Sequence, residues 1–473
     1  MPHGCRYETP PTAIKLLLGF WATSDEYLIN GFSAALRVSG PTMRGDSSRI
    51  KSSTARIKAT EESPKSTSQT IFERDASPNA RFFQGGTLDL HPESGLAALK
   101  KAGLYDAAHE HLRYDGEEMF ITDKNNTVLT HMQDLDKTSG DSEYARPEID
   151  REDLKGLLLK SINPESIHWG KTLQSVGPSA GILTFRDGPT AGPFDLVVGA
   201  DGAWSKVRDV LTDVRPCYSG ICGFESTIPT SHEQYPKISK IVGRGSYLVS
   251  SDHVNLTVQR MANESLKVGI WIAGNETYPA DLMAAYGSDE AKLKDKVIEN
   301  YIGWASDILR CIRASTNFRP WPLYELPVGN TWDHRNGFTL IGDAASLMTP
   351  FAGEGVNKAM ADSLELAEAL EQASHSGQDM DEGVRQYETN MFPRAKRYQT
   401  LTQRNKVAMF SENGAVNLMV GMVDLIAEEL GFNIDKGCLA WIPVRSVMFC
   451  WLSFWQKLGI WRRKARELFS SQS

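Results

Sequence analysis

The chain has 473 residues, of which 41% are hydrophobic and 23% are charged, as in ordinary globular proteins. This length predicts two domains rather than a single core. The net charge of −8 argues against a nucleic-acid-binding protein, which needs a basic face. The six cysteines are scattered, without the spacing of a zinc site or a disulfide framework, so we expect no metal and a reducing, cytoplasmic environment.

The segment 1–67 is atypical. Residues 42–69 are rich in Ser, Thr, Lys, Arg and Glu, and they contain neither an apolar strand nor an apolar helical stripe. The apolar run at 14–21 is interrupted by Lys15 and is too short to span a bilayer. Two interpretations stay open for 1–67: the segment is disordered, or it is not the true N-terminal sequence of the protein.

An ordered pattern follows this segment. A short apolar strand runs into Glu73, and the loop after it contains Arg81 and ends in the sequence GGTLDLH, which includes Asp89. An acidic side chain at a strand end binds ribose hydroxyls in dinucleotide folds. Further along, Asp150 is the candidate N-cap of a helix that starts at Arg151.

A second motif reads DLVVGADGAWSKVR over residues 195–208. An apolar strand ends in Gly-Ala-Asp-Gly, with the carboxylate at Asp201, and a helix starts after it. Ser205 and the helix start offer hydrogen-bond donors, and Arg208 offers a fixed cation for a phosphate. The alternative interpretation is a tight strand-to-helix turn that is capped by Asp201.

Residues 215–324 have the pattern of a second, sheet-containing domain. Runs of alternating apolar and polar residues, for example 246–250 and 254–260, predict strands, and residues 281–313 have a helical pattern. Three aromatic side chains of this region are candidates for lining a substrate pocket: Trp271, Trp321 and Tyr324.

The most specific motif reads GFTLIGDAASLMTPFAGEGVN over residues 337–357. An apolar strand runs into Gly342 and Asp343, a loop rich in Pro and Gly follows, and a long helix opens near Val356. A carboxylate at a strand end can hold a sugar hydroxyl, and a helix start offers backbone N–H groups and the positive end of its dipole. This arrangement suits a ligand with a ribityl chain, a pyrophosphate and an electron-rich ring, as in a flavin.

Together these motifs resemble those of the FAD-dependent aromatic-ring (group A) monooxygenases, which have the fold of para-hydroxybenzoate hydroxylase. The segments that surround Glu73 and Arg151 are similar to those of the tetracycline-inactivating flavin monooxygenases. The resemblance implies an α/β fold with a Rossmann-like FAD-binding domain, a β-sheet substrate domain and a helical C-terminus. The ranges that we expect for these parts are 68–214 with 325–410, 215–324 and 411–473, respectively.

The resemblance also implies roles for single residues. Glu73 would bind the adenosine ribose, and Asp343 would hold the ribityl chain. Arg81 would face the flavin or the incoming NADPH, Asp89 would touch the flavin side of its loop, and Arg151 would reach the FAD phosphate or the ribityl region. The rest of the expected cofactor-binding set lies in the second and third motifs: Asp201, Gly353, Gly355 and Asn357.

The first fingerprint of the family is not recognisable. Its G-x-G-x-x-G turn should lie some twenty residues before the acidic residue, but residues 50–55 read IKSSTA. A Cβ at the middle glycine would stand where the pyrophosphate approaches the backbone. Two hypotheses stay open: an FAD enzyme whose true N-terminal sequence differs from 1–67, or a non-catalytic flavin-fold protein that binds small molecules and has lost tight FAD binding.

The activity that the resemblance implies is monooxygenation. FAD, NADPH or NADH, and O2 would serve to hydroxylate a phenolic or polyketide-like small molecule, in secondary metabolism or xenobiotic modification. The ten histidines form no Ser/His/Asp set in the sequence, so no catalytic side chain is assigned. We expect a monomer that binds a small aromatic substrate.

The C-terminal tail is rich in tryptophan. Residues 438–461 hold four of the eleven tryptophans, and a basic run follows them. Tryptophan flanked by basic residues is typical of a helix that lies in the membrane interface. Two hypotheses stay open here: peripheral membrane contact through 438–466, or a helix that packs on the body of the enzyme.

Overall fold

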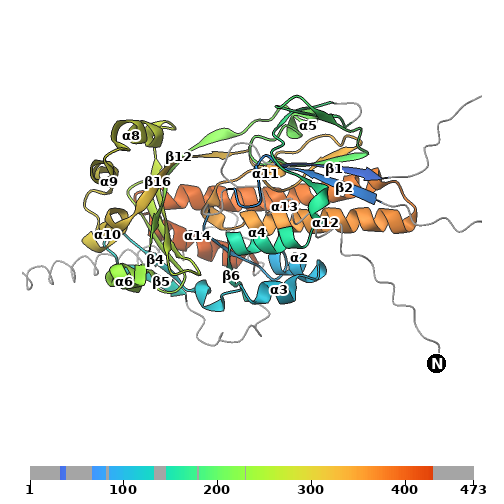
Figure 1. The fold of residues 1–473 in the computed structure, drawn as a ribbon. Helices are drawn as coiled ribbons and strands as arrows, with labels where there is room; N and C mark the ends of the chain where they lie inside the picture. The colour runs from blue at the N-terminus through green and yellow to red at the C-terminus, as the bar shows by residue number, and fades with distance from the viewer. Residues whose placement is uncertain are drawn as a thin grey trace, which may run out of the picture.

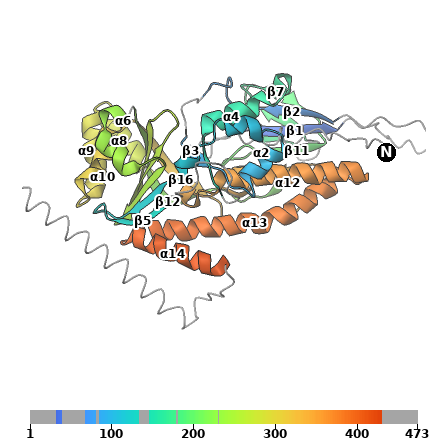
Figure 2. The ribbon, with the colours of Figure 1, turned by 90° about the horizontal axis from the view of Figure 1, so that it is seen from below.

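The computed structural model describes residues 32–38, 67–80, 85–132, 145–177, 181–229 and 231–429. Figures 1 and 2 show two sheet-containing regions, and the long helices α12 (Gly355–Ser376) and α13 (Met380–Met409) run beneath the first of them. Helix α13 continues toward the second sheet, where α14 (Gly414–Glu429) turns back along it (Figure 2). The expected residue Arg81 and the tail 438–466 lie outside the described residues.

The first sheet has five strands in the order β17-β11-β1-β2-β7. Strands β17 and β11 are parallel to each other, and so are β2 and β7, whereas β1 is antiparallel to both of its neighbours. Strands β11 and β17 are buried along their whole length, as expected for strands covered on both faces. The bounds are β1 (Phe32–Val38), β2 (Thr67–Phe72), β7 (Ile167–His168), β11 (Leu196–Ala200) and β17 (Phe338–Leu340).

The central strand β1 therefore runs against the other four. Phe32, its first residue, pairs with Ala200 at the end of β11, and Ser33 pairs with Phe72 at the end of β2. In dinucleotide-binding folds the first strand is parallel to its neighbours, and its carboxyl end carries the phosphate-binding glycine turn. Here the carboxyl end of β1 lies at the opposite edge of the sheet, which agrees with the absence of a G-x-G-x-x-G in the sequence.

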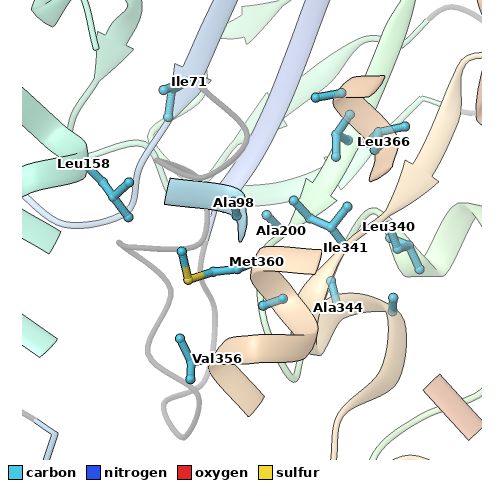
Figure 3. Close-up of a cluster of buried hydrophobic side chains, with 14 of the residues drawn as sticks. Ile71, Ala98, Leu158, Ala200, Leu340, Ile341, Ala344, Val356, Met360 and Leu366 are labelled. Carbon is cyan, nitrogen blue, oxygen red and sulfur yellow. The ribbon is translucent and has the colours of Figure 1, made fainter. Parts of the chain in front are cut away.

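Helices cover this sheet and bury its apolar side chains. Small residues such as Ala98, Ala200 and Ala344 allow helices to approach the strands closely, and Leu340, Met360 and others fill the remaining space (Figure 3). The covering helices include α2 (Gly95–Lys101), α3 (Tyr105–His109), α4 (Arg151–Lys160), α11 (Gly342–Ser346) and α12. Two small sheets lie beside this domain: β3 (Thr87–Asp89) with β6 (Glu148–Asp150), and β8 (Leu173–Val176) with β9 (Leu183–Phe185) and β10 (Thr190–Ala191).

The second sheet has seven strands in the order β16-β12-β15-β14-β13-β4-β5. Neighbours are antiparallel except β13 and β4, which are parallel. Strands β4 and β5 lie within 68–214, the range that the sequence suggests for the FAD-binding domain, yet they complete this sheet. The bounds are β4 (Met119–Thr122), β5 (Val128–Met132), β12 (Cys217–Ile228), β13 (Ser246–Ser251), β14 (Val254–Arg260), β15 (Leu266–Ala273) and β16 (Thr316–Glu325).

The two faces of the second sheet have different partners. Helices α8 (Tyr278–Tyr286), α9 (Glu290–Ile298) and α10 (Ser306–Ala314) cover one face with a large apolar core, which confirms the helical pattern predicted for 281–313. The other face packs against the turn at Phe351 and against α14. Within the described ranges, no helix is both long and apolar enough to cross a bilayer.

Candidate functional site

Strands β11 and β17 bring the second and third motifs together. Val197 pairs with Phe338, and the Ile341 N–H donates to the Gly199 carbonyl at 2.9 Å. A Cβ on Gly199 would stand 2.6 Å from Leu340 Cδ2, so a larger residue would push the two strands apart. The sequences GADG and GDAA therefore leave the sheet at the same edge.

Asp201 is held within its own turn. Its buried carboxylate accepts hydrogen bonds from Ser205 Oγ, from the Lys206 N–H at 2.6 Å and from the Val207 N–H at 3.3 Å. Burial raises the pKa of Asp201 to about 6, although these hydrogen bonds favour the charged form. The carboxylate caps the strand-to-helix turn, as in the alternative interpretation of this motif, and its role toward a cofactor stays a prediction.

Arg208 connects the same two motifs. Its buried guanidinium donates through Nη1 to the Ala344 carbonyl at 2.9 Å and through Nη2 to the Ala203 carbonyl. Its backbone N–H donates to Ser205 Oγ at 2.9 Å. Two of its donors are thus occupied by backbone carbonyls, so Arg208 ties the turns together rather than presenting a phosphate-binding fork.

The turn that carries Asp343 is fixed by buried side chains of α12. Gly342 adopts a φ of +60°, and its N–H donates to Asp362 Oδ2 at 2.9 Å. Lys358 Nζ donates to the Gly342 carbonyl and to Ser346 Oγ, both at 2.8 Å. Because Lys358 and Asp362 are fully buried and lie 4.0 Å apart, they neutralise each other and hold this turn.

Glu73 lies at the same edge as Asp343. It follows β2, is fully buried, and accepts a hydrogen bond from the Asp75 N–H at Oε1. Strand β1 is antiparallel to both β2 and β11, and β11 is parallel to β17. Strands β2 and β17 therefore run in the same direction. Three strand intervals separate them, or about 14 Å at about 4.8 Å per interval.

Asn357 joins the Asp89 segment to the start of α12. Its Nδ2 donates to the Asp89 carbonyl at 2.9 Å, and its Oδ1 accepts from the His91 N–H at 2.9 Å and from Ser94 Oγ at 3.2 Å. Gly353 has a φ of +70°, and Asp89 Oδ1 lies 3.7 Å from the position that its Cβ would take. The structure thus brings together Asp89, Gly353 and Asn357, and Gly355 is the first residue of α12.

Arg151 lies against the beginning of the same segment. Its Nε is 2.6 Å from where a Cβ on Gly85 would stand, and Gly85 has a φ of +88°. Asp150 is the N-cap residue of this helix, as predicted, but its side chain makes no capping hydrogen bond. Asp150 instead pairs with Arg113 at 3.0 Å and accepts from the Ala262 N–H at 3.0 Å.

Sequence reasoning missed three ionisable residues beside Asp89: His91, Glu148 and Glu354. His91 stands two residues from Asp89 in an extended segment, which places both side chains on one side. Glu148 pairs with Asp89 across β3 and β6, and Thr87 Oγ1 donates to its carboxylate at 2.7 Å. Burial and the neighbouring Asp89 carboxylate raise the pKa of Glu148 to about 8. The alternation around Asp89 could have indicated His91, whereas Glu148 and Glu354 come near Asp89 only through the fold.

The expected pocket aromatics separate into two groups. Trp271 and Trp321 are buried on the inward face of the second sheet, in one cluster with Phe351. Tyr324 projects from the other side of β16 and contacts Trp204, with ring centroids 5.1 Å apart. Tyr324 therefore stands apart from Trp271 and Trp321, because side chains alternate along a strand, and the lining of a pocket by these three residues stays a prediction.

The two ends of this edge fit FAD. Glu73 and Asp343 are placed where they could offer one carboxylate to each sugar of an extended dinucleotide, and these roles stay predictions. Among the described residues, only Asp89 Oδ1 lies within 4 Å of the position that a Cβ on Gly353 would take, so this part of the turn could accept a flat ring. The middle of this edge fits FAD less well. The first residue of β1 lies there, whereas in dinucleotide-binding folds a phosphate-binding turn follows the last residue of the first strand.

The sequence and the fold of this chain are similar to those of known proteins. Residues 185–402 match the family described as FAD binding domain. The monooxygenase asqM of Emericella nidulans is 34% identical over 73% of this chain and 90% of its own length. The 3-amino-4-hydroxybenzoate 2-monooxygenase PtnB3 of Streptomyces platensis is 27% identical over 52% of this chain and 60% of its own. The crystal structure of tetracycline destructase Tet(51), 17% identical, aligns with a TM-score of 0.54 over 77% of this chain and 91% of that chain, which confirms the predicted fold class.

Proposed function

Because the chain belongs to the FAD-dependent aromatic-ring (group A) monooxygenases, we propose that it uses NADPH or NADH and O2 to hydroxylate a phenolic or polyketide-like small molecule. FAD, when bound, supplies the redox chemistry that activates oxygen. The side chains of the protein bind and orient the two reactants and exclude water from them.

The positions of the described residues support roles for several of the expected cofactor-binding side chains. Glu73 would bind the adenosine ribose and Asp343 the ribityl chain, since each follows one of two parallel strands at the same edge of the sheet. Arg151 would serve the phosphate or ribityl region from the start of α4, beneath the glycines that precede Asp89. Gly353 would border the isoalloxazine, because its left-handed conformation keeps side-chain atoms away from the turn.

One juxtaposition carries the proposal of an aromatic substrate. Trp271 and Trp321 on the second sheet pack in the same cluster as Phe351, which belongs to the turn of the third motif. A flat substrate held against these rings would lie beside the end of the cofactor that reacts. The name of the Streptomyces platensis relative, a monooxygenase of 3-amino-4-hydroxybenzoate, supports the phenolic class.

Arg319 supports a substrate with an acidic group. Its guanidinium lies 4.7 Å from the Trp321 ring centroid, and within the described part of the chain it makes no hydrogen bond and no ion pair. A stacked guanidinium of this kind offers its N–H edge to a phenolate or a carboxylate. Glu225, its cross-strand neighbour in the register, would disfavour acidic groups that approach from that side.

The test is turnover by the FAD-reconstituted chain. NADPH and NADH oxidation is measured with a panel of phenolic acids and their uncharged esters, and products are identified by mass spectrometry. We expect oxidation that accelerates with a phenol and a product heavier by one oxygen atom. Arg319→Gln should raise KM for the acids by about tenfold and leave kcat nearly unchanged, whereas the exposed Arg313→Gln should not. Reconstituted chain without any hydroxylated product would contradict the proposal.

The reversed strand β1 favours a second candidate, a flavin-fold protein that binds small molecules without catalysis. Such a protein would bind a phenolic acid with no flavin present and would show no NADPH oxidation after FAD is added. Calorimetry of the cofactor-free chain with salicylate, beside the turnover assay, separates the two functions.

A further inference from the structure

His91 is enclosed by carboxylates on both sides of its ring. Its side chain is only 4% exposed. Nε2 lies 2.9 Å from Asp89 Oδ2, and Nδ1 lies 3.5 Å from Glu354 Oε2 and 3.9 Å from Glu93 Oε1. Asp89 belongs to the segment that leads from β3, whereas Glu354 is the residue before α12, so the imidazole stands between two elements that are far apart in sequence.

The number of protons on the ring follows from this geometry. A neutral imidazole has one N–H, so either tautomer would direct a lone pair at one of the two carboxylates. Only the imidazolium donates a hydrogen bond to Asp89 and also directs a second N–H at Glu354, which it contacts as an ion pair at 3.5 Å rather than through a hydrogen bond. Burial opposes the charge, but the hydrogen bond and charge of Asp89 and the charge of Glu354 outweigh it, and the pKa of His91 is raised above its ordinary value.

Other charged groups near His91 do not reverse the increase in its pKa. Arg146, which precedes β6, opposes the proton, and Glu93 lies beyond Nδ1. Glu354 itself is largely buried, which raises its pKa, while the positive charge of His91 acts in the other direction. Tyr398 on α13 faces Glu354. The carboxylates around the ring therefore outnumber the neighbouring cation.

We propose that the imidazolium of His91 is an ionic latch that fixes the Asp89 segment to the Gly353 turn and so pre-forms the isoalloxazine edge of the FAD site. This inference rests on the proposed function. His91 is a positioning residue, because it acts through Asp89 and Glu354. Asn357 makes a second, neutral connection between the same elements, so loss of the proton loosens the edge without unfolding it.

The latch makes FAD binding depend on pH. When His91 loses its proton, Asp89 and Glu354 face each other across a neutral ring, and one carboxylate loses its donor. A hydrogen bond to a charged group contributes about 1.5–3 kcal/mol, so the FAD dissociation constant should rise by about tenfold or more as pH passes through the raised pKa of His91. Below the ordinary histidine pKa of about 6.5 the latch is fully formed.

The first experiment needs no cofactor. Proton NMR titration of the cofactor-free chain, with His91→Asn to assign the signal, measures the pKa of the imidazole directly. We expect it to lie above 6.5, the ordinary value, and to fall in Glu354→Gln. A His91 that titrates at or below the ordinary value would overturn the latch, whatever the chain does with FAD.

The second experiment measures FAD affinity by quenching of flavin fluorescence across the same pH range. The FAD affinity of the wild type should fall with rising pH. The FAD affinity of His91→Asn should be low at every pH, and that of Glu354→Gln should begin to fall at a lower pH than in the wild type. The control is His111→Asn, which removes a half-exposed imidazole 3.4 Å from Asp153 and should behave as the wild type.

The outcomes distinguish this inference from the proposed function. If His91→Asn keeps both the affinity and the pH profile of the wild type, the latch is refuted while the monooxygenase proposal stands. If the wild type binds no FAD at any pH, the proposed function fails, and the inference that depends on it fails too. Circular dichroism of each variant confirms that the fold is retained.

Discussion

At one end of the cofactor edge, buried side chains of α12 hold the Asp343 turn, whereas at the middle of the edge the strand β1 runs against its neighbours. The first end depends on Lys358, Asp362 and Asn357, which belong to one helix. The phosphate position depends on the backbone path of a strand from the N-terminal segment. A flavin site can therefore be well formed where the ring lies and poorly formed where the phosphates lie, and the two properties can be tested separately.

The largest expected effect concerns the phosphate position. We expect the purified chain to contain little flavin, with weak yellow absorbance, because the described residues place no glycine turn with backbone donors at the middle of the cofactor edge. Loss of two or more hydrogen bonds to a charged group corresponds to about a hundredfold weaker binding or more. A chimera whose first strand and turn carry G-x-G-x-x-G should recover that factor. A bright yellow wild-type protein with one flavin per chain would show that the phosphate position is not poorly formed.

At the other end, Asn357→Ala should lower the free energy of unfolding by about 2–3 kcal/mol, because three hydrogen bonds are lost and the buried His91 N–H and Asp89 carbonyl are left without a partner. Urea denaturation measures the change. Asn390→Ala, on the exposed face of α13, is the matched control and should stay within about 0.5 kcal/mol of the wild type. Equal effects of both variants would show that the Asp89 segment is not held by α12.

Asp343→Ala should weaken FAD binding by about tenfold, since its half-buried carboxylate is presented by a turn that other residues fix. Fluorescence titration with FAD gives the ratio of dissociation constants. Asp333→Ala removes an exposed carboxylate in the nearby connection and should have no effect. If Asp343→Ala binds FAD as tightly as the wild type, the prediction that Asp343 holds the ribityl chain is wrong.

The smallest expected effect lies away from the cofactor. His334 stands between Glu388, 2.7 Å from Nδ1, and Asp381, 2.9 Å from Nε2. Burial opposes its charge, but both carboxylates outweigh it and raise the pKa of His334. This contribution, on the order of 1 kcal/mol, is complete below the ordinary pKa of about 6.5 and is lost as pH rises through the raised value. The stability difference between wild type and His334→Gln should therefore shrink with rising pH; a constant difference would contradict the charged state.

The late motif was predictable because its chemistry is local. Asp343 lies in α11, which begins two residues after the buried strand β17. The glycines and Asn357 come within one loop and one helical turn of it, so residues that are close in sequence are also close in space. The same is true of Glu73 after β2. These positions agree with general rules for strand ends and helix starts.

The parts that could not be predicted depend on distant partners. Strands β4 and β13 pair although more than a hundred residues separate them, and no local pattern indicates which sheet β4 joins. Asp150 has the sequence context of a helix cap, but Arg113 and the Ala262 N–H compete successfully for its carboxylate. The environment of His91 depends on Glu354, which is brought near only by the fold.

The contacts of Asp150 and Arg113 reach across the molecule to the hairpin between β14 and β15. Asp150 accepts from the Ala262 N–H at 3.0 Å, and Arg113 Nη1 donates to the Arg260 carbonyl at 3.2 Å. Lys406 of α13 makes a comparable connection to Glu325 of β16, with an Nζ–Oε1 distance of 2.6 Å. A hinge motion that swung the two domains apart would break these charge-assisted bonds together, at about 1.5–3 kcal/mol each. These contacts therefore favour a frame in which the two domains keep their relative orientation.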